Sequence, residues 1–267
     1  MNKSDQLILE NEDEMQEEKT IEEFLQDLGF GKAHLLLWSF FFLIPILKMS
    51  QLYLVLIIIP YLRCEWDLGT GFEAAIGSIS HIVRAFTGAP LGGLADKFGR
   101  KRVLITAIFM FIVSGLCLAT APGKWTFLAA RVLQGCAIGL CSHIPFVYVA
   151  EIASSEFKEI AVLAMAVSTH FGCVWVSVLS YLLLNTAGWR NMILIVTAPL
   201  FVVAAGLLCI PETPRYALVS SGKGKALKSL RNLYRLNGKV LPPDSLIECS
   251  TATGKVETRG KTFLVKG

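Results

Sequence analysis

Gly92-Gly93-Leu94-Ala95-Asp96-Lys97-Phe98-Gly99-Arg100-Lys101-Arg102 is a short, charged turn between two long apolar segments. Three basic residues follow Gly99, and an acidic residue stands four positions after Gly92. Clustered Lys and Arg resist translocation, so membrane proteins place such turns where two spanning helices reverse on the cytoplasmic side. A soluble protein seldom puts so hydrophilic a turn between such segments. This stretch therefore predicts a helical membrane protein.

The composition of the whole chain agrees with a membrane protein. The chain is 54% hydrophobic and 17% charged, and its mean hydropathy is +0.56. Several stretches reach the roughly 18–20 apolar residues that cross a bilayer as a helix. Backbone groups in lipid must be satisfied within their own segment, so these stretches are expected to be helices. The six predicted spans are Leu35–Ile59, Ala74–Leu94, Val103–Ala121, Trp125–Ala150, Ala161–Leu184 and Met192–Ile210.

The distribution of Lys and Arg between the connections predicts the orientation. One side of the membrane would carry only Arg63, Lys124 and Arg190. The other side would carry Lys97, Arg100, Lys101, Arg102, Lys158, Arg215, Lys223, Lys225, Lys228, Arg231, Arg235 and Lys239. The positive-inside rule places the second side, and with it both termini, in the cytoplasm. The membrane is expected to be the plasma membrane or that of an intracellular vesicle. The net charge of +4 reflects these loops and does not indicate a nucleic-acid partner.

The chain divides into three predicted parts. Residues 1–33 form an acidic cytoplasmic tail, in which Ile21, Phe24, Leu25 and Leu28 recur at helical spacing. This spacing predicts a short amphipathic helix that lies along the membrane. Residues 34–210 form the six-helix transmembrane domain. Residues 211–267 form a cytoplasmic helix, from Lys225 to Leu236, and a polar tail that stops before a second set of spans.

Short motifs at the ends of the spans narrow the class of protein. The charged turn has the pattern G-x-x-x-D-x-x-G-R-[RK], and the others are Arg131-Val-Leu-Gln134-Gly135, Gly188-Trp189-Arg190 and Pro211-Glu212-Thr213-Pro214-Arg215. Together they resemble the major facilitator superfamily of transporters, with the last two typical of sugar porters and organic-ion transporters. Leu28-Gly29-Phe30-Gly31-Lys32 and Cys64-Glu65-Trp66 resemble segments of its SVOP-like branch, which is related to synaptic vesicle glycoproteins. The resemblance runs from about residue 20 to residue 240.

The resemblance implies an all-α fold of twelve helices in two halves, of which this chain carries the first. It implies translocation of a small solute by alternating access, with the solute bound near the membrane midplane. The expected partners are membrane lipid, the solute and a second transporter half or a dimer partner. No organic cofactor or metal is implied, and no nucleophile–base or metal-ligand spacing predicts an enzyme. The alternative is a truncated, non-transporting protein that associates with or regulates a full-length relative.

The resemblance also implies a latch and charge network at the cytoplasmic ends of the helices. Its residues would be Gly92, Asp96, Gly99, Arg100, Lys101, Glu151, Glu212 and Arg215. Asp96 would help to latch the outward-facing state, and Glu151, Glu212 and Arg215 would join Arg100 in the network. The alternative is that the basic residues only anchor the topology and that the other charges are solvated helix ends.

Polar residues within the spans are the candidates for a substrate cavity: Lys48, Gln51, His81, Arg84, Arg131, Gln134 and His170. A charge at mid-membrane costs about 3 kcal/mol or more, so it usually lines a cavity or pathway. At a rise of 1.5 Å per residue, Lys48 and Arg84 are both roughly 15–17 Å deep. Relatives often have acidic residues midway along the first helix, where this chain reads Lys48-Met49-Ser50-Gln51.

The charges within the spans predict the kind of solute. No Asp or Glu lies well inside any predicted span, so the cavity would have a positive lining. Such a lining favours an anionic or carboxylate-bearing solute. The alternatives are that Lys48 snorkels to one surface or that acids in a second half pair with the cations.

Overall fold

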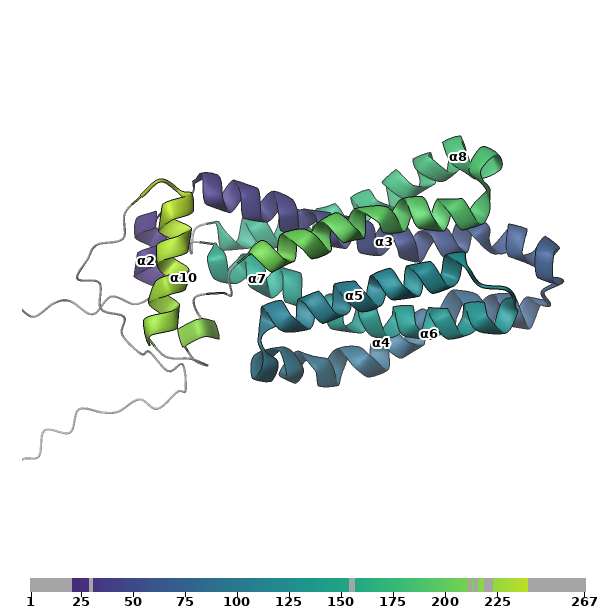
Figure 1. Ribbon diagram of the computed structural model, residues 1–267, viewed down its shortest axis with the longest axis horizontal. Helices are drawn as coiled ribbons and strands as arrows, with labels where there is room; N and C mark the ends of the chain where they lie inside the picture. The colour runs from purple at the N-terminus through teal and green to yellow at the C-terminus, as the bar shows by residue number, and fades with distance from the viewer. Residues whose placement is uncertain are drawn as a thin grey trace, which may run out of the picture.

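The computed structural model describes residues 21–28, 31–153, 157–210, 213, 216–218 and 223–239, and every regular element in this part of the chain is an α-helix. In chain order the helices are α2 (Ile21–Leu28), α3 (Lys32–Trp66), α4 (Thr70–Phe98), α5 (Arg100–Ala119), α6 (Lys124–Cys141), α7 (Ile144–Ile152), α8 (Lys158–Cys209) and α10 (Lys223–Leu236). The long helices run side by side along one axis, and α2 and α10 lie together across one end (Figure 1). The all-α prediction is therefore confirmed.

Four segments of the described chain are long and apolar enough to cross a membrane: His34–Trp66, Arg100–Ala119, Lys124–Ile152 and Lys158–Leu208. The last has 51 residues, more than twice the number needed for one crossing. It is interrupted at Gly188, whose φ of 77° and ψ of 160° are not helical. Glycine adopts this backbone conformation without steric cost. Figure 1 shows two limbs of α8 meeting at a tight reversal, at the end of the bundle opposite α2 and α10.

Two differences between the helix boundaries and the predicted spans change how the chain turns. α4 continues beyond Leu94 to Phe98, so most of the charged stretch predicted as a turn is helical and only Gly99, with a φ of 101°, separates α4 from α5. The segment from Trp125 to Ala150 is divided between α6 and α7, because Pro145 follows α6 by four residues. Proline has no backbone N–H and its ring clashes with the carbonyl four residues earlier, which here belongs to Cys141.

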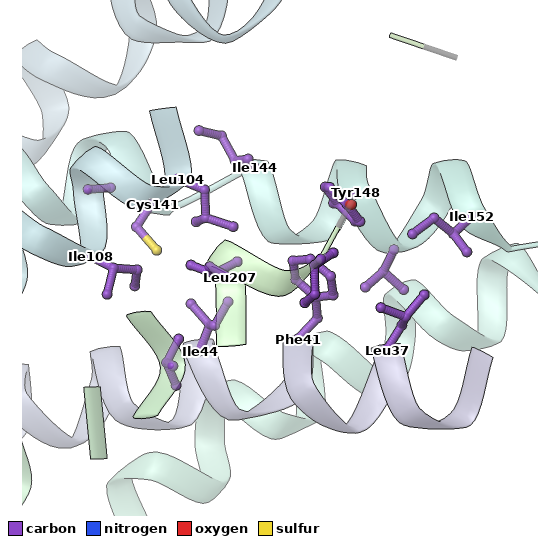
Figure 2. Close-up of a cluster of buried hydrophobic side chains, with 14 of the residues drawn as sticks. Leu37, Phe41, Ile44, Leu104, Ile108, Cys141, Ile144, Tyr148, Ile152 and Leu207 are labelled. Carbon is purple, nitrogen blue, oxygen red and sulfur yellow. The ribbon is translucent and has the colours of Figure 1, made fainter. Parts of the chain in front are cut away.

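A buried apolar cluster joins the helices at the end of the bundle nearer α2 and α10. Leu37, Phe41 and Ile44 of α3 face residues of α5, α6, α7 and α8 (Figure 2). The rings of Phe41 and Tyr148 stack with their centroids 4.4 Å apart. Both α6 and α7 are therefore packed into the bundle, on either side of the break before Pro145.

The α2 helix packs against α10. Phe24 is 2% exposed and lies in the same buried cluster as Leu230 and Leu233. The Tyr234 hydroxyl donates a hydrogen bond of 2.8 Å to the Phe24 carbonyl oxygen, and Lys239 Nζ donates one of 3.2 Å to the Asp27 carbonyl oxygen. The amphipathic helix predicted from the sequence is present, but Phe24 on its apolar face is covered by protein.

Candidate transport site

Arg131 of α6 is fully enclosed between helices, at 0% exposure. Its Nε donates to the Ile76 carbonyl oxygen at 3.1 Å, and its Nη2 to that of Gly77 at 3.5 Å. In return, Ser80 Oγ donates to the Arg131 carbonyl oxygen at 2.8 Å. α6 can approach α4 this closely because Gly135 has no side chain, and a Cβ there would lie 2.9 Å from the Ser80 carbonyl oxygen.

A chain of hydrogen bonds leads from Arg131 across the bundle. Arg131 Nη1 donates to Gln134 Oε1, and Gln134 Nε2 donates to Gln51 Oε1 of α3 at 3.3 Å. Gln51 Nε2 then donates to Thr197 Oγ1 in the second limb of α8 at 2.6 Å. All four side chains are at most 2% exposed. Buried polar groups are costly unless they are paired. This series of hydrogen bonds therefore fixes α3, α6 and α8 relative to one another.

Gly115 of α5 leaves room for the last of these hydrogen bonds. A Cβ at Gly115 would lie 2.5 Å from both Gln51 Nε2 and Thr197 Oγ1. Gln51, Arg131 and Gln134 were predicted from the sequence as cavity candidates, whereas Gly115 and Thr197 were not. A glycine and a threonine within apolar spans carry no distinguishing signal until the helices are brought together.

Lys48 is one turn before Gln51 on α3 and is 7% exposed. Its ammonium group lies within electrostatic range of the Arg84 guanidinium of α4. Among the described residues, no carboxylate forms an ion pair with Lys48. Lys48 is therefore a buried cation near a second cation, and such a position is costly without a paired counter-charge.

The two histidines among the candidates are exposed. His81 lies one turn before the half-buried Arg84 on α4 and interacts electrostatically with Arg84 and Arg131. His170 lies on α8, where its Nδ1 is 3.1 Å from the Ala166 carbonyl oxygen of its own helix. His81 therefore lies near Arg84 and Arg131, and no described contact joins His170 to these residues.

Some of the residues predicted to form a charge network have polar contacts at the end of the bundle nearer α10. Arg100 forms an ion pair with Glu151 of α7, and their side chains are 17% and 8% exposed. Lys101 Nζ donates a hydrogen bond of 3.0 Å to the Leu208 carbonyl oxygen at the end of α8. Gly92 and Asp96 lie in α4, but the surroundings of both residues, together with Glu212 and Arg215, are outside the part of the chain whose contacts are described.

A second polar and aromatic cluster lies at the opposite end, where the sequence analysis proposed no site. Glu65 of α3 accepts hydrogen bonds of 2.7 Å from Trp189 Nε1 and from Arg190 Nη2, both just after Gly188. The Trp66 ring contacts those of Trp189 and Phe127, with centroids 5.7 Å and 5.6 Å apart. Two of the motifs that carry the family resemblance, Cys64-Glu65-Trp66 and Gly188-Trp189-Arg190, therefore meet in space.

Metal ligands are not gathered in the described part of the chain, which has no group of three or more His, Cys, Asp or Glu residues placed to hold an ion. The polar groups between Arg131 and Thr197 are instead a guanidinium, two amides and a hydroxyl. Their hydrogen bonds hold α3, α6 and α8 together.

Comparison with known proteins places this arrangement in a family. A family model described as "Sugar (and other) transporter" matches residues 65–265. Synaptic vesicle 2-related protein of Rattus norvegicus is 28% identical over 244 residues, which cover 90% of this chain and 43% of that protein. The protein of the same name in Xenopus laevis is 27% identical over 244 residues, which again cover 90% of this chain and 43% of that protein. The chain thus spans less than half the length of these curated relatives.

The fold has solved counterparts. The xylose transporter XylE from E. coli, in a partially occluded inward-open conformation, matches with a TM-score of 0.68 and 21% identity. The match covers 76% of this chain and 55% of that one. The structural likeness shows the fold, and the family model covers most of the sequence. The chain therefore belongs to the sugar (and other) transporter family within the major facilitator superfamily, and it corresponds to the N-terminal half of its relatives.

Proposed function

We propose that this chain is the six-crossing half of a transporter that moves a small organic solute by alternating access. The count of six adds two crossings to the four apolar segments. One is α4, whose 29 residues would extend about 44 Å at 1.5 Å per residue. The other comes from α8, which supplies one crossing on each side of Gly188. The family supports transport in general, since its description names transporters and its solved counterpart is a xylose transporter.

The proposed orientation follows from the charge distribution. Lys97, Arg102 and Lys158 are exposed at the end of the bundle that carries α10, whereas the opposite end carries Arg63, Lys124 and Arg190. Of the latter three, Arg63 and Arg190 are in ion pairs with Glu73 and Glu65. The positive-inside rule supports a cytoplasmic position for the α10 end.

We infer further that the solute is anionic or carries a carboxylate. The observation that carries this proposal is Lys48, a 7% exposed cation near the middle of α3 that has no ion-paired carboxylate among the described residues. A charge in such a place is costly, and an arriving anion would reduce that cost. Lys48 and Arg84 would contact the solute, because the Arg131 guanidinium is already engaged with Ile76, Gly77 and Gln134.

The test uses the chain completed by a second transporter half, supplied in the same polypeptide or by assembly, in proteoliposomes. We expect uptake of organic anions to exceed uptake of organic cations, and the chain alone to transport little because one wall of the cavity is missing. Lys48→Gln and Arg84→Gln should each lower anion uptake about tenfold, the effect of losing a hydrogen bond to a charged group.

Arg102→Gln provides the matched control, because it removes an exposed cation at the end of the bundle and should leave uptake unchanged. Unchanged anion uptake in both cavity variants, or selective uptake of cations by the parent, would show that the charge argument is wrong. Cross-linking shows whether the chain alone is monomeric in the liposomes. Vectorial transport by the monomeric chain would contradict the need for a second half.

A further inference from the structure

The α10 helix has a basic face that the proposed transport mechanism does not use. Lys228, Arg231 and Arg235 are exposed, and their spacing of three and four residues places them on the same side of the helix. Leu230 and Leu233 are buried on the opposite side. The helix contains no Asp or Glu, and among the described residues no carboxylate forms an ion pair with these three cations.

The position of α10 is fixed by contacts with the start of the chain. Besides the hydrogen bonds from Tyr234 and Lys239 to α2, Asn237 packs against Gly31, where a Cβ would lie 2.6 Å from Asn237 Oδ1. In Figure 1 the helix runs across the long axis of the bundle. Because the spanning helices run along that axis, α10 lies roughly parallel to the membrane plane, at the end proposed to be cytoplasmic.

We propose that the basic face formed by Lys228, Arg231 and Arg235 binds the phosphate-bearing headgroups of anionic lipids in the cytoplasmic leaflet. That leaflet has a negative surface potential, which attracts basic segments next to spanning helices. Guanidinium groups match phosphate geometry with two parallel hydrogen bonds, so two arginines on one face suit this ligand. The inference goes beyond solute transport, and it rests on the proposed orientation only for the choice of leaflet.

Lipid retention by the intact chain tests the proposal. The chain, purified in detergent, is incubated with equal amounts of phosphatidylserine and phosphatidylcholine, and the bound lipids are counted by native mass spectrometry. We expect phosphatidylserine to be retained in about tenfold excess, and the excess to fall when the salt concentration is raised. The triple variant K228Q/R231Q/R235Q should lose most of this excess while keeping the phosphatidylcholine that binds the spanning helices.

The matched control is K97Q/R102Q/K158Q, which removes three exposed cations from the same end but none from α10. It should retain the phosphatidylserine excess. An equal loss in both triple variants would show a general effect of charge and overturn the assignment to α10, and so would an unchanged excess in the α10 variant. A photoreactive group on Asn232→Cys, beside the basic face, should cross-link phosphatidylserine. Cross-linking to an acidic peptide in preference to phosphatidylserine would also overturn the proposal.

Discussion

At the scale of single residues, the buried cations Arg131 and Lys48 differ in the groups that surround them. Arg131 is held by two backbone carbonyls of α4 and by Gln134, so its charge is engaged within the bundle. Lys48 is almost as buried but has no ion-paired carboxylate among the described residues. Sequence reasoning placed these two cations in one group because both lie deep in apolar spans. Only their surroundings distinguish the cation that links helices from the one without a paired carboxylate among the described residues.

Gly115→Ala is expected to lower the stability of the fold. The added methyl group would lie 2.5 Å from Gln51 Nε2 and Thr197 Oγ1, so the hydrogen bond between them must lengthen or break. We expect a loss of about 1–3 kcal/mol, as for other cases of overpacking and lost buried hydrogen bonds. Equilibrium unfolding of the detergent-solubilised chain measures it.

Gly71→Ala is the control for this prediction, because no atom lies within 4 Å of the position of its Cβ. Alanine loses less conformational freedom than glycine when a helix forms, so this variant should be as stable as the parent or slightly more stable. Equal stability of Gly115→Ala and Gly71→Ala would contradict the proposed importance of the Gln51–Thr197 contact.

At the scale of elements, the helices are joined at both ends of the bundle by polar contacts. The Arg100–Glu151 pair joins α5 to α7 near α10, and Glu65 joins the end of α3 to the reversal in α8. The Glu65–Arg190 ion pair is substantially exposed and contributes little stability alone. The aromatic packing of Trp189, which is 6% exposed, is therefore the larger contribution at that end.

Trp189→Ala should be strongly destabilising, since it removes a large buried ring that contacts Trp66 and Phe127 and also leaves Glu65 without one hydrogen bond. Typical losses for a buried tryptophan are about 3 kcal/mol or more. Trp125→Ala removes the same side chain at a site that is 70% exposed, where we expect a much smaller loss. Thermal unfolding of both variants in the same detergent compares them, and equal effects would argue against the importance of the Trp66–Phe127–Trp189 cluster.

At the scale of the whole molecule, the described helices form a single bundle with a distinct cap. Both limbs of α8 fold back along the other long helices, and α2 and α10 cover one end (Figure 1). The exposed apolar side chains are concentrated on α8, where Phe171, Val174, Tyr181 and Val202 are each more than half exposed. Such a surface is consistent with contact to lipid or to further helices.

The orientation of the molecule is tested by labelling intact cells. Single cysteines are introduced at Lys97 and Lys228 for the end that carries α10, and at Thr126 for the opposite end, in a variant without native exposed thiols. All three positions are exposed in the structure. We expect an impermeant thiol reagent to label only the cysteine at Thr126 before permeabilisation, because clustered Lys and Arg stay cytoplasmic. Labelling from outside at Lys97 or Lys228 would reverse the proposed topology.

The sequence alone determined the class of protein, because apolar length, charge distribution and end motifs are local properties. It predicted the helical membrane fold, the reversal at Gly188 through the Gly-Trp-Arg motif, and Arg100 and Glu151 as members of one network. It did not locate the break before Pro145, and it did not predict that Phe24 packs against α10. Tertiary structure alone decided that Gln51 reaches Thr197 beside Gly115 and that Glu65 reaches Trp189. The partners in each of these two hydrogen bonds are more than a hundred residues apart in the chain, so only packing brings them together. Gly115 matters only because it has no side chain, which shows only when its neighbours are in place.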